Sequence, residues 1–237
     1  MGTSAGYSLP TGGNWSKLKR DVTNWASTGA SDSQSVGRVG SSFVEAHHGA
    51  RQAAQQMSNA AQAGSRFAGF VSGVAQNGLA ETLNRFNLGQ YVGRSASDVL
   101  RGIRDFLISD NSLLEDDIVQ NGFVDFYEEQ LLSDNSFEGL ERTLQQVDIS
   151  NMLMRFFGFC IYRQFVVEFQ ERMMKLIDIP TTQRQLALMK DYIFTKLRVR
   201  THEKNLAKVD WNGNEGRALS AEILESAWQF SELSNAN

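Results

Sequence analysis

Cysteine and histidine are scarce in this sequence, and their scarcity restricts the chemistry that it can carry. Among its 237 residues there is one cysteine, Cys160, and there are three histidines. A single thiol excludes an internal disulfide framework and a cysteine-rich zinc site, and it is typical of a reducing compartment. Cys160 lies in the apolar stretch FFGFCIY, so we expect a buried thiol with no catalytic base beside it.

The three histidines do not form a metal-binding pattern. His47 and His48 are adjacent, and neighbouring residues of a helix project about 100° apart, so the two rings share few sites. Glu45 is the one acidic residue at ligand spacing, whereas a zinc site needs three or four ligands. His202 lies in the polar stretch RTHEKN and is expected at the surface. We therefore predict no metal site.

Targeting and membrane signals are also missing. The N-terminus has no basic region followed by an apolar run, as a secretory signal would have, and no stretch of about 18 apolar residues predicts a membrane-spanning helix. The expected location is therefore cytoplasmic. The formal net charge is −4, from 23 Lys and Arg against 27 Asp and Glu, which favours neither a strong nucleic-acid binder nor an acidic disordered chain.

Proline is nearly absent, and the sequence shows helical periodicity almost throughout. Pro10 and Pro180 are the two prolines, and no alternating apolar runs bounded by turns predict strands. The predicted fold class is therefore all-α: a helical bundle with an extended Gly/Ser-rich N-terminal segment.

Two long helices are predicted within this bundle. An apolar stripe predicts one small-residue helix over 43–76, in which Gly64, Gly69 and Gly73 indicate close approach of a neighbour. Residues 150–177 are apolar nearly all round, which predicts a central, buried helix that stops before Pro180.

The chain is predicted to have three parts. Residues 1–42 contain 7 Gly, 9 Ser and 4 Thr, so they cannot bury enough apolar surface to fold alone. We predict that they form an extended partner-docking segment with one short helix. Trp15 and Trp25 are its predicted anchors, on either the helical body or another protein. Residues 43–147 form a small-residue-rich helical subdomain and residues 148–237 a C-terminal helical subdomain, either separate or as one bundle.

Charged clusters offer candidate sites, each with a simpler explanation. Lys196, Arg200, Lys204 and Lys208 are spaced by four and form a basic stripe, most simply a solvated helix face, with an acidic partner or nucleic-acid phosphates as alternatives. Several carboxylates fit a helix N-terminal turn and a solvated face better than acid–base catalysis: Glu115, Asp116, Asp117, Glu128 and Glu129. No phosphate-binding loop occurs, and no catalytic residue is predicted.

The opening MGTSAG has some features of a lipid-attachment signal. Gly2 would become terminal once Met1 is removed, but the myristoylation motif wants Ser or Thr at the sixth position. That residue is Gly6, so lipidation is not expected.

The order of features resembles a known family. The sequence starts with MGTS, continues with VGSSFVEAHHGARQAAQQMSNAAQAGSRFAGFVSG and LGQYVGRSASDVLRGIRDFL, and carries VDWNGNEGRALSAEILESAW near its end. This layout resembles the QatB family, a component of the bacterial Qat anti-phage defence system.

The resemblance implies a non-enzymatic role among partners. Members act beside an ATPase, a QueC-like protein (QatC) and a TatD-like nuclease. The QueC-like protein is similar to enzymes that use ATP to build 7-deazapurines from a carboxylate precursor, and in related systems such proteins join a deazapurine to a companion's amino terminus. ATP and the 7-deazapurine precursor would belong to that partner, and no cofactor is expected on this chain.

Carried onto this sequence, the resemblance implies that the chain feeds its N-terminus into the QueC-like active site. Gly2 would be the acceptor after Met1 removal. The implied partner-binding residues are Gly2, Thr3, Ser4, Ala5, Gly6, Tyr7, Trp15 and Trp25. Two alternatives remain: a scaffold that joins the ATPase and QueC-like subunits, and, more weakly, a nucleic-acid-binding module.

Overall fold

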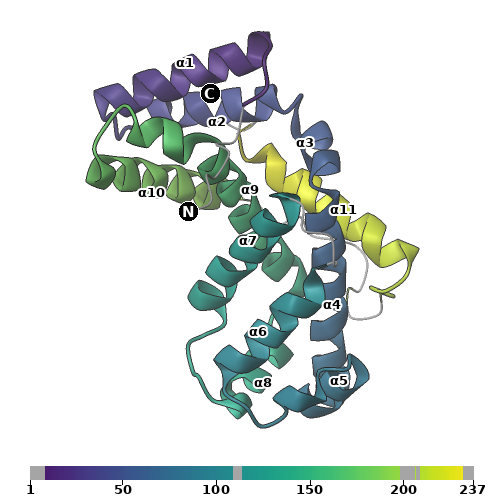
Figure 1. Cartoon of the computed structure of the whole chain (residues 1–237). Coiled ribbons are helices and arrows are strands. Elements are labelled where there is room, and N and C mark those ends of the chain that lie inside the picture. The colour runs from purple at the N-terminus through teal and green to yellow at the C-terminus, as the bar shows by residue number, and fades with distance from the viewer. Residues whose placement is uncertain (1–8, 109–113, 198–205, 207–208, 232–237) are drawn as a thin grey trace.

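The regular structure of this chain consists of helices. The computed structural model describes residues 9–108, 114–197, 206 and 209–231, and within these every regular element is helical (Figure 1). The predicted all-α class is confirmed. No helix in these ranges is both long enough and apolar enough to cross a membrane.

The helices follow one another closely along the chain. In order they are α1 (Gly13–Thr28), α2 (Ser33–Ala46), α3 (Ala50–Gln56), α4 (Ser58–Asn77), α5 (Leu79–Arg85), the 3-10 helix η1 (Gly89–Tyr91), α6 (Ala96–Leu107), α7 (Leu114–Gln130), α8 (Phe137–Gln146), α9 (Ile149–Met174), α10 (Ile179–Lys196) and α11 (Asn214–Trp228).

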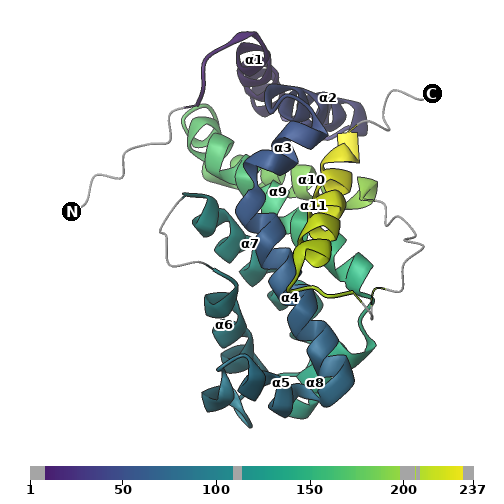
Figure 2. The same cartoon turned by 90° about the vertical axis from the view of Figure 1, so that its right-hand side faces the viewer.

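Helix α9 is the centre of the fold, as its sequence predicted. It contacts α1, α4, α7, α10 and α11, and Figures 1 and 2 show it enclosed by them. Phe156, Phe159 and Phe165 on different sides of the helix are all fully buried, because a neighbour covers each side. Asp178 caps the next helix, α10, by accepting from the Thr181 amide at 2.8 Å. Pro180 lies in the first turn of α10, where the missing N–H costs nothing.

The N-terminal part is more helical than predicted. The expected short helix is present as α1, but residues 33–46 also form a helix, so the prediction of an extended segment is wrong for residues 33–42. The Asp32 carboxylate caps α2 by accepting from the Ser35 amide at 2.8 Å, a signal that the high Ser and Gly content obscured. Helices α1 and α2 pack together as a hairpin, and residues 1–8 lie outside the described residues.

The predicted continuous helix over 43–76 is wrong, because the chain turns twice within it. Helix α2 ends in a Schellman motif, in which the Gly49 amide bonds the Val44 carbonyl at 2.9 Å and the His48 amide bonds the Glu45 carbonyl at 3.0 Å. His48 takes the left-handed conformation there, with φ 64°, a place usually held by glycine. A second break at Met57 separates α3 from α4.

The predicted close approach at the α4 glycines is confirmed. A methyl group added at Gly64 would lie 2.5 Å from the Phe157 ring and 2.8 Å from the Ser220 hydroxyl. Gly69 lies against the loop that carries Trp211, and the Ser65 hydroxyl donates to the Trp211 carbonyl at 2.5 Å. Small residues on α4 therefore let α9, α11 and this loop pack directly against its backbone.

Candidate functional site

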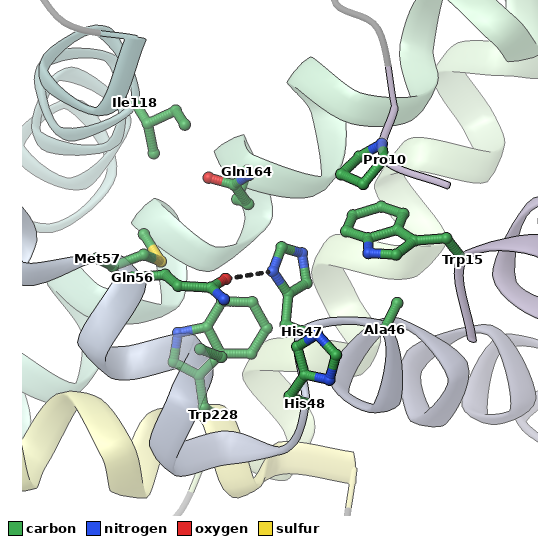
Figure 3. A pocket seen from close by; sticks show the side chains of 11 residues that line it. Pro10, Trp15, Ala46, His47, His48, Gln56, Met57, Ile118, Gln164 and Trp228 are labelled. Carbon is green, nitrogen blue, oxygen red and sulfur yellow. Dashed lines mark hydrogen bonds between the residues drawn. The ribbon is translucent and has the colours of Figure 1, made fainter. Parts of the chain in front are cut away.

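A cavity lies where the described chain begins. Its volume is about 370 Å³, and α1, α2, the α2–α3 turn, α3, α7, α9 and α11 all contribute to it (Figure 3). Its lining residues are Pro10, Trp15, Ala46, His47, His48, Ala53, Gln56, Met57, Ile118, Gln164 and Trp228. We call it the N-terminal cavity, because Pro10 at its edge leads directly to residues 1–8.

His47 is the polar centre of this cavity wall. Its Nδ1 lies 3.1 Å from Gln56 Oε1 on α3, and its Nε2 lies 3.2 Å from Glu168 Oε1 on α9. Aromatic rings surround the imidazole at centroid distances of 5.1 Å for Trp15, 5.0 Å for Phe43 and 5.3 Å for Trp228. Figure 3 shows His47 with its bond to Gln56 and with Trp15 and Trp228 on either side. One histidine thus joins α1, α2, α3, α9 and α11.

The arrangement favours a charged imidazolium. Burial by itself lowers the pKa of His47, but the contact with Glu168, the charge of that carboxylate and the bond to Gln56 outweigh burial and raise the pKa above 6.5. Both ring nitrogens face oxygen atoms, which only the doubly protonated ring satisfies. His47 Nε2 and Glu168 Oε1 are close enough for an ion pair, but their relative orientation does not meet the geometry of a hydrogen bond. The carboxylate also accepts from Gln164 Nε2 at 2.5 Å.

The lining of the cavity determines what it can hold. In the part of the chain that the structure describes, no Lys, Arg, Asp or Glu side chain lines it, so it offers no ion-pair partner to a phosphate or a carboxylate. The His47 charge is already matched by Glu168, which leaves it unsuited to act as a general base. Apolar walls with side-chain amides suit an uncharged peptide segment or side chain.

Both predicted tryptophan anchors are buried within the chain itself. Trp15 is 8% exposed and Trp25 is 3% exposed, and the Trp25 indole donates to the Ala30 carbonyl at 2.9 Å. Of the two docking surfaces considered for this segment, the helical body is the one that the structure supplies. Direct contact of these indoles with a partner stays a prediction. For Trp25, such a contact would require the hairpin to open.

Most of the other candidate residues lie outside the described part of the chain. Lys196 ends α10 with its ammonium 5.8 Å from the Tyr192 ring centroid, while Arg200, Lys204, Lys208 and His202 lie outside the described residues, as do Gly2, Thr3, Ser4, Ala5, Gly6 and Tyr7. The structure therefore does not test the basic stripe or the terminal residues.

Two members of the acidic cluster have partners on different helices. Asp116 is buried and accepts from Asn59 Nδ2 at 3.1 Å, whereas Glu129 pairs with Lys190 on α10. Cys160 is fully buried, which raises the pKa of its thiol, as the apolar reading of its surroundings predicted. Among the described residues, no group of three His, Cys, Asp or Glu side chains could hold a metal ion.

Sequence reasoning missed Glu168. It lies 121 residues after His47, so no local spacing connects the two. A signal was nevertheless present: Gln164 and Glu168 are four residues apart in a stretch that is apolar nearly all round, and a buried polar pair there needs a partner from another element.

Comparison with known proteins gives one finding. The model of the family described as "Qat anti-phage system associated protein QatB" matches residues 49–231. No curated protein and no solved structure matches. The match covers the chain from the start of α3 through α11, and the α1–α2 hairpin precedes it.

Proposed function

Because the chain belongs to the QatB family of Qat anti-phage system associated proteins, we propose that it is a non-enzymatic component of an anti-phage defence complex that binds the QueC-like protein QatC and presents its own N-terminus to that partner. The terminus is the substrate for conjugation of a deazapurine. ATP and the deazapurine precursor are held by the partner, and the complex works in the cytoplasm.

The chemistry suits a terminal glycine. After Met1 removal, the Gly2 α-amine attacks the carbonyl carbon of a precursor carboxylate that the partner has activated with ATP. An amide bond forms, the activating group leaves with the bonding electrons, and the amine loses a proton. Such amines titrate near 7.7–8.0, so a fraction is neutral at physiological pH. The small side chains of Thr3, Ser4, Ala5 and Gly6 suit an extended chain in a narrow channel.

The observation that supports this proposal is the fixed point from which the terminus leaves the body. Lys19 Nζ donates to the Pro10 carbonyl at 2.9 Å, Leu9 packs against the core, and Pro10 borders the N-terminal cavity beside Trp15. Seven residues, 2–8, precede Leu9 once Met1 is removed, and a fully extended chain of that length reaches about 23–25 Å. That reach is enough to enter a partner's active site while the helical body stays outside.

The test is intact-mass spectrometry of the chain produced with and without QatC. We expect a mass increase that needs the partner and maps to the first peptide. Gly2→Pro, which turns the amine into a hindered secondary one, removes the modification and defence, whereas the matched control Gly2→Ala keeps a primary amine and both activities. An unmodified terminus in a cell that resists phage would refute conjugation.

A scaffold role is the second candidate, and an exposed apolar cluster favours it. Met174, Leu176 and Ile179 are 43%, 44% and 55% exposed at the α9–α10 turn, and exposed apolar clusters mark contact surfaces. Deleting residues 2–8 separates the candidates: a pure scaffold keeps complex formation and defence, whereas a modification substrate loses defence.

A further inference from the structure

A groove runs along the face of the molecule formed by α3, α4 and α11. These three helices lie nearest the viewer in Figure 2. The groove has a volume of about 590 Å³ and is lined by Arg51, Ala54, Gln55, Ser58, Asn59, Ala61, Gln62, Arg217, Ala221, Glu222 and Glu225. We call it the α3–α11 groove. It lies wholly within the residues that match the family.

The two walls of the groove run antiparallel. The Ser220 hydroxyl donates to the Ala61 carbonyl at 2.7 Å near one end, and Trp228 packs against His47 just before α3 at the other. Arg217 therefore lies at the Gln62 end of the groove and Glu225 at the Arg51 end, with Glu222 between them. Eight residues separate Arg217 from Glu225, so this wall is about 12 Å long, a little over two helical turns.

The floor is made of alanines and would let a third backbone approach closely. Ala54 and Ala61 each keep 8% exposure, and Ala221 is exposed on the α11 side. Two packed helices with small residues between them offer the groove into which a third helix fits, with interaxial distances of 8–10 Å. An extended strand would leave its own backbone N–H and C=O groups facing methyl groups.

Most of the charged side chains on the rim have no partner among the described residues. In those ranges the side chains of Arg51, Glu222 and Glu225 make no ion pair or hydrogen bond, and the Arg217 guanidinium donates to Asn214 Oδ1 at 2.6 Å without an acidic partner. A partner that covers them must supply opposite charges, since a buried unpaired charge is costly. Such complementarity sets the orientation and choice of partner.

We propose that the α3–α11 groove is the docking site for one helix of the partner protein. That helix carries a seam of small side chains at i, i+4 spacing, a Lys or Arg opposite Glu222 and Glu225, and a carboxylate opposite Arg217. The identity of the partner as the QueC-like protein rests on the proposed function. Because the groove is separate from the N-terminal cavity, docking here leaves residues 1–8 free for chemistry.

The test is calorimetric titration of the full-length chain with purified QatC. Ala221→Trp fills the groove from an exposed position, and its matched control is Ala187→Trp, an equally exposed alanine on α10. Glu222→Lys reverses one charge, and its control is Glu128→Lys on the exposed face of α7. We expect each groove variant to weaken binding about tenfold or more, as loss of a central interface contact does, while both controls bind as wild type. Because all four positions are exposed, melting temperatures should stay unchanged.

Hydrogen exchange of the complex then identifies the bound segment. We expect protection of a partner segment whose small residues recur every fourth position, and an alternating pattern would overturn the helical occupant. If the groove variants bind as wild type, the groove is not the docking site, and the proposed function is unaffected. If the wild-type chain does not bind the QueC-like protein, both the docking site and the proposed function are refuted. If sedimentation shows a wild-type dimer that Ala221→Trp dissociates, the groove joins two copies of this chain and the partner assignment is wrong.

Discussion

Replacing Glu168 with Gln tests whether the His47–Glu168 pair holds the N-terminal hairpin to the body. The Glu168 side chain is fully buried and His47 is nearly so, with the two groups 3.2 Å apart. Removing one partner of a buried ion pair leaves the other charge uncompensated, which typically costs about 3–5 kcal/mol. A whole domain is stable by only about 5–15 kcal/mol, so the effect is a large fraction of the total.

The pH dependence follows from the direction of the shift. Because the folded protein holds the pKa of His47 above its unfolded value of 6.5, the pair stabilises fully below about pH 6.5, and this stabilisation is lost as pH rises through the folded pKa. In Glu168→Gln, His47 is still buried but has no carboxylate beside it, which disfavours the imidazolium. The free energy of unfolding of the variant is therefore lowered most at low pH, where the imidazole would be protonated. The difference in the free energy of unfolding between wild type and variant is therefore largest near pH 5.5 and narrows by pH 9.

Urea unfolding followed by tryptophan fluorescence measures this difference, since Trp15 and Trp228 flank His47. The matched control is Glu45→Gln, which removes the exposed pair with Lys17 and should cost no more than about 1 kcal/mol at either pH. A Glu168→Gln cost that is equal at pH 5.5 and pH 9, or no larger than that of the control, would refute the buried-pair reasoning.

Three other substitutions or treatments test the packing and the surfaces. Gly64→Ala should destabilise by about 1–3 kcal/mol in urea unfolding, because the added methyl meets Phe157, whereas Gly13→Ala, with nothing within 4 Å, should not. Alkylation of Cys160, whose burial raises its thiol pKa, should be negligible in the native protein by mass spectrometry and rapid in urea; fast native labelling would contradict its burial. The double substitution Leu176→Ser and Ile179→Ser should change the melting temperature by no more than about 2 °C, since exposed positions contribute little to stability. If the scaffold role is correct, it should reduce capture of the ATPase. Unchanged capture would exclude this surface as the ATPase contact.

Local patterns determined much of the helical content. The short helix predicted within residues 1–42 is α1, whose Trp15, Leu18, Val22 and Trp25 are buried. The glycines of the predicted small-residue helix indicated the close packing that is observed at Gly64. Continuous apolarity identified α9 as the central helix because a helix buried on every side has no polar face. The break at His48 was not foreseen, since a left-handed histidine fits no common end signal.

The sequence by itself determined the fold class, the buried character of Cys160 and the family resemblance, because helical periodicity, apolar surroundings and motif order are properties of neighbouring residues. Tertiary structure decided the rest. Only folding brings Glu168 to His47 across 121 residues, closes the N-terminal cavity with side chains from six helices, and lays α11 antiparallel to α3 and α4 to form the groove. Such contacts depend on how helices pack, and helix packing is a long-range property that no local pattern encodes.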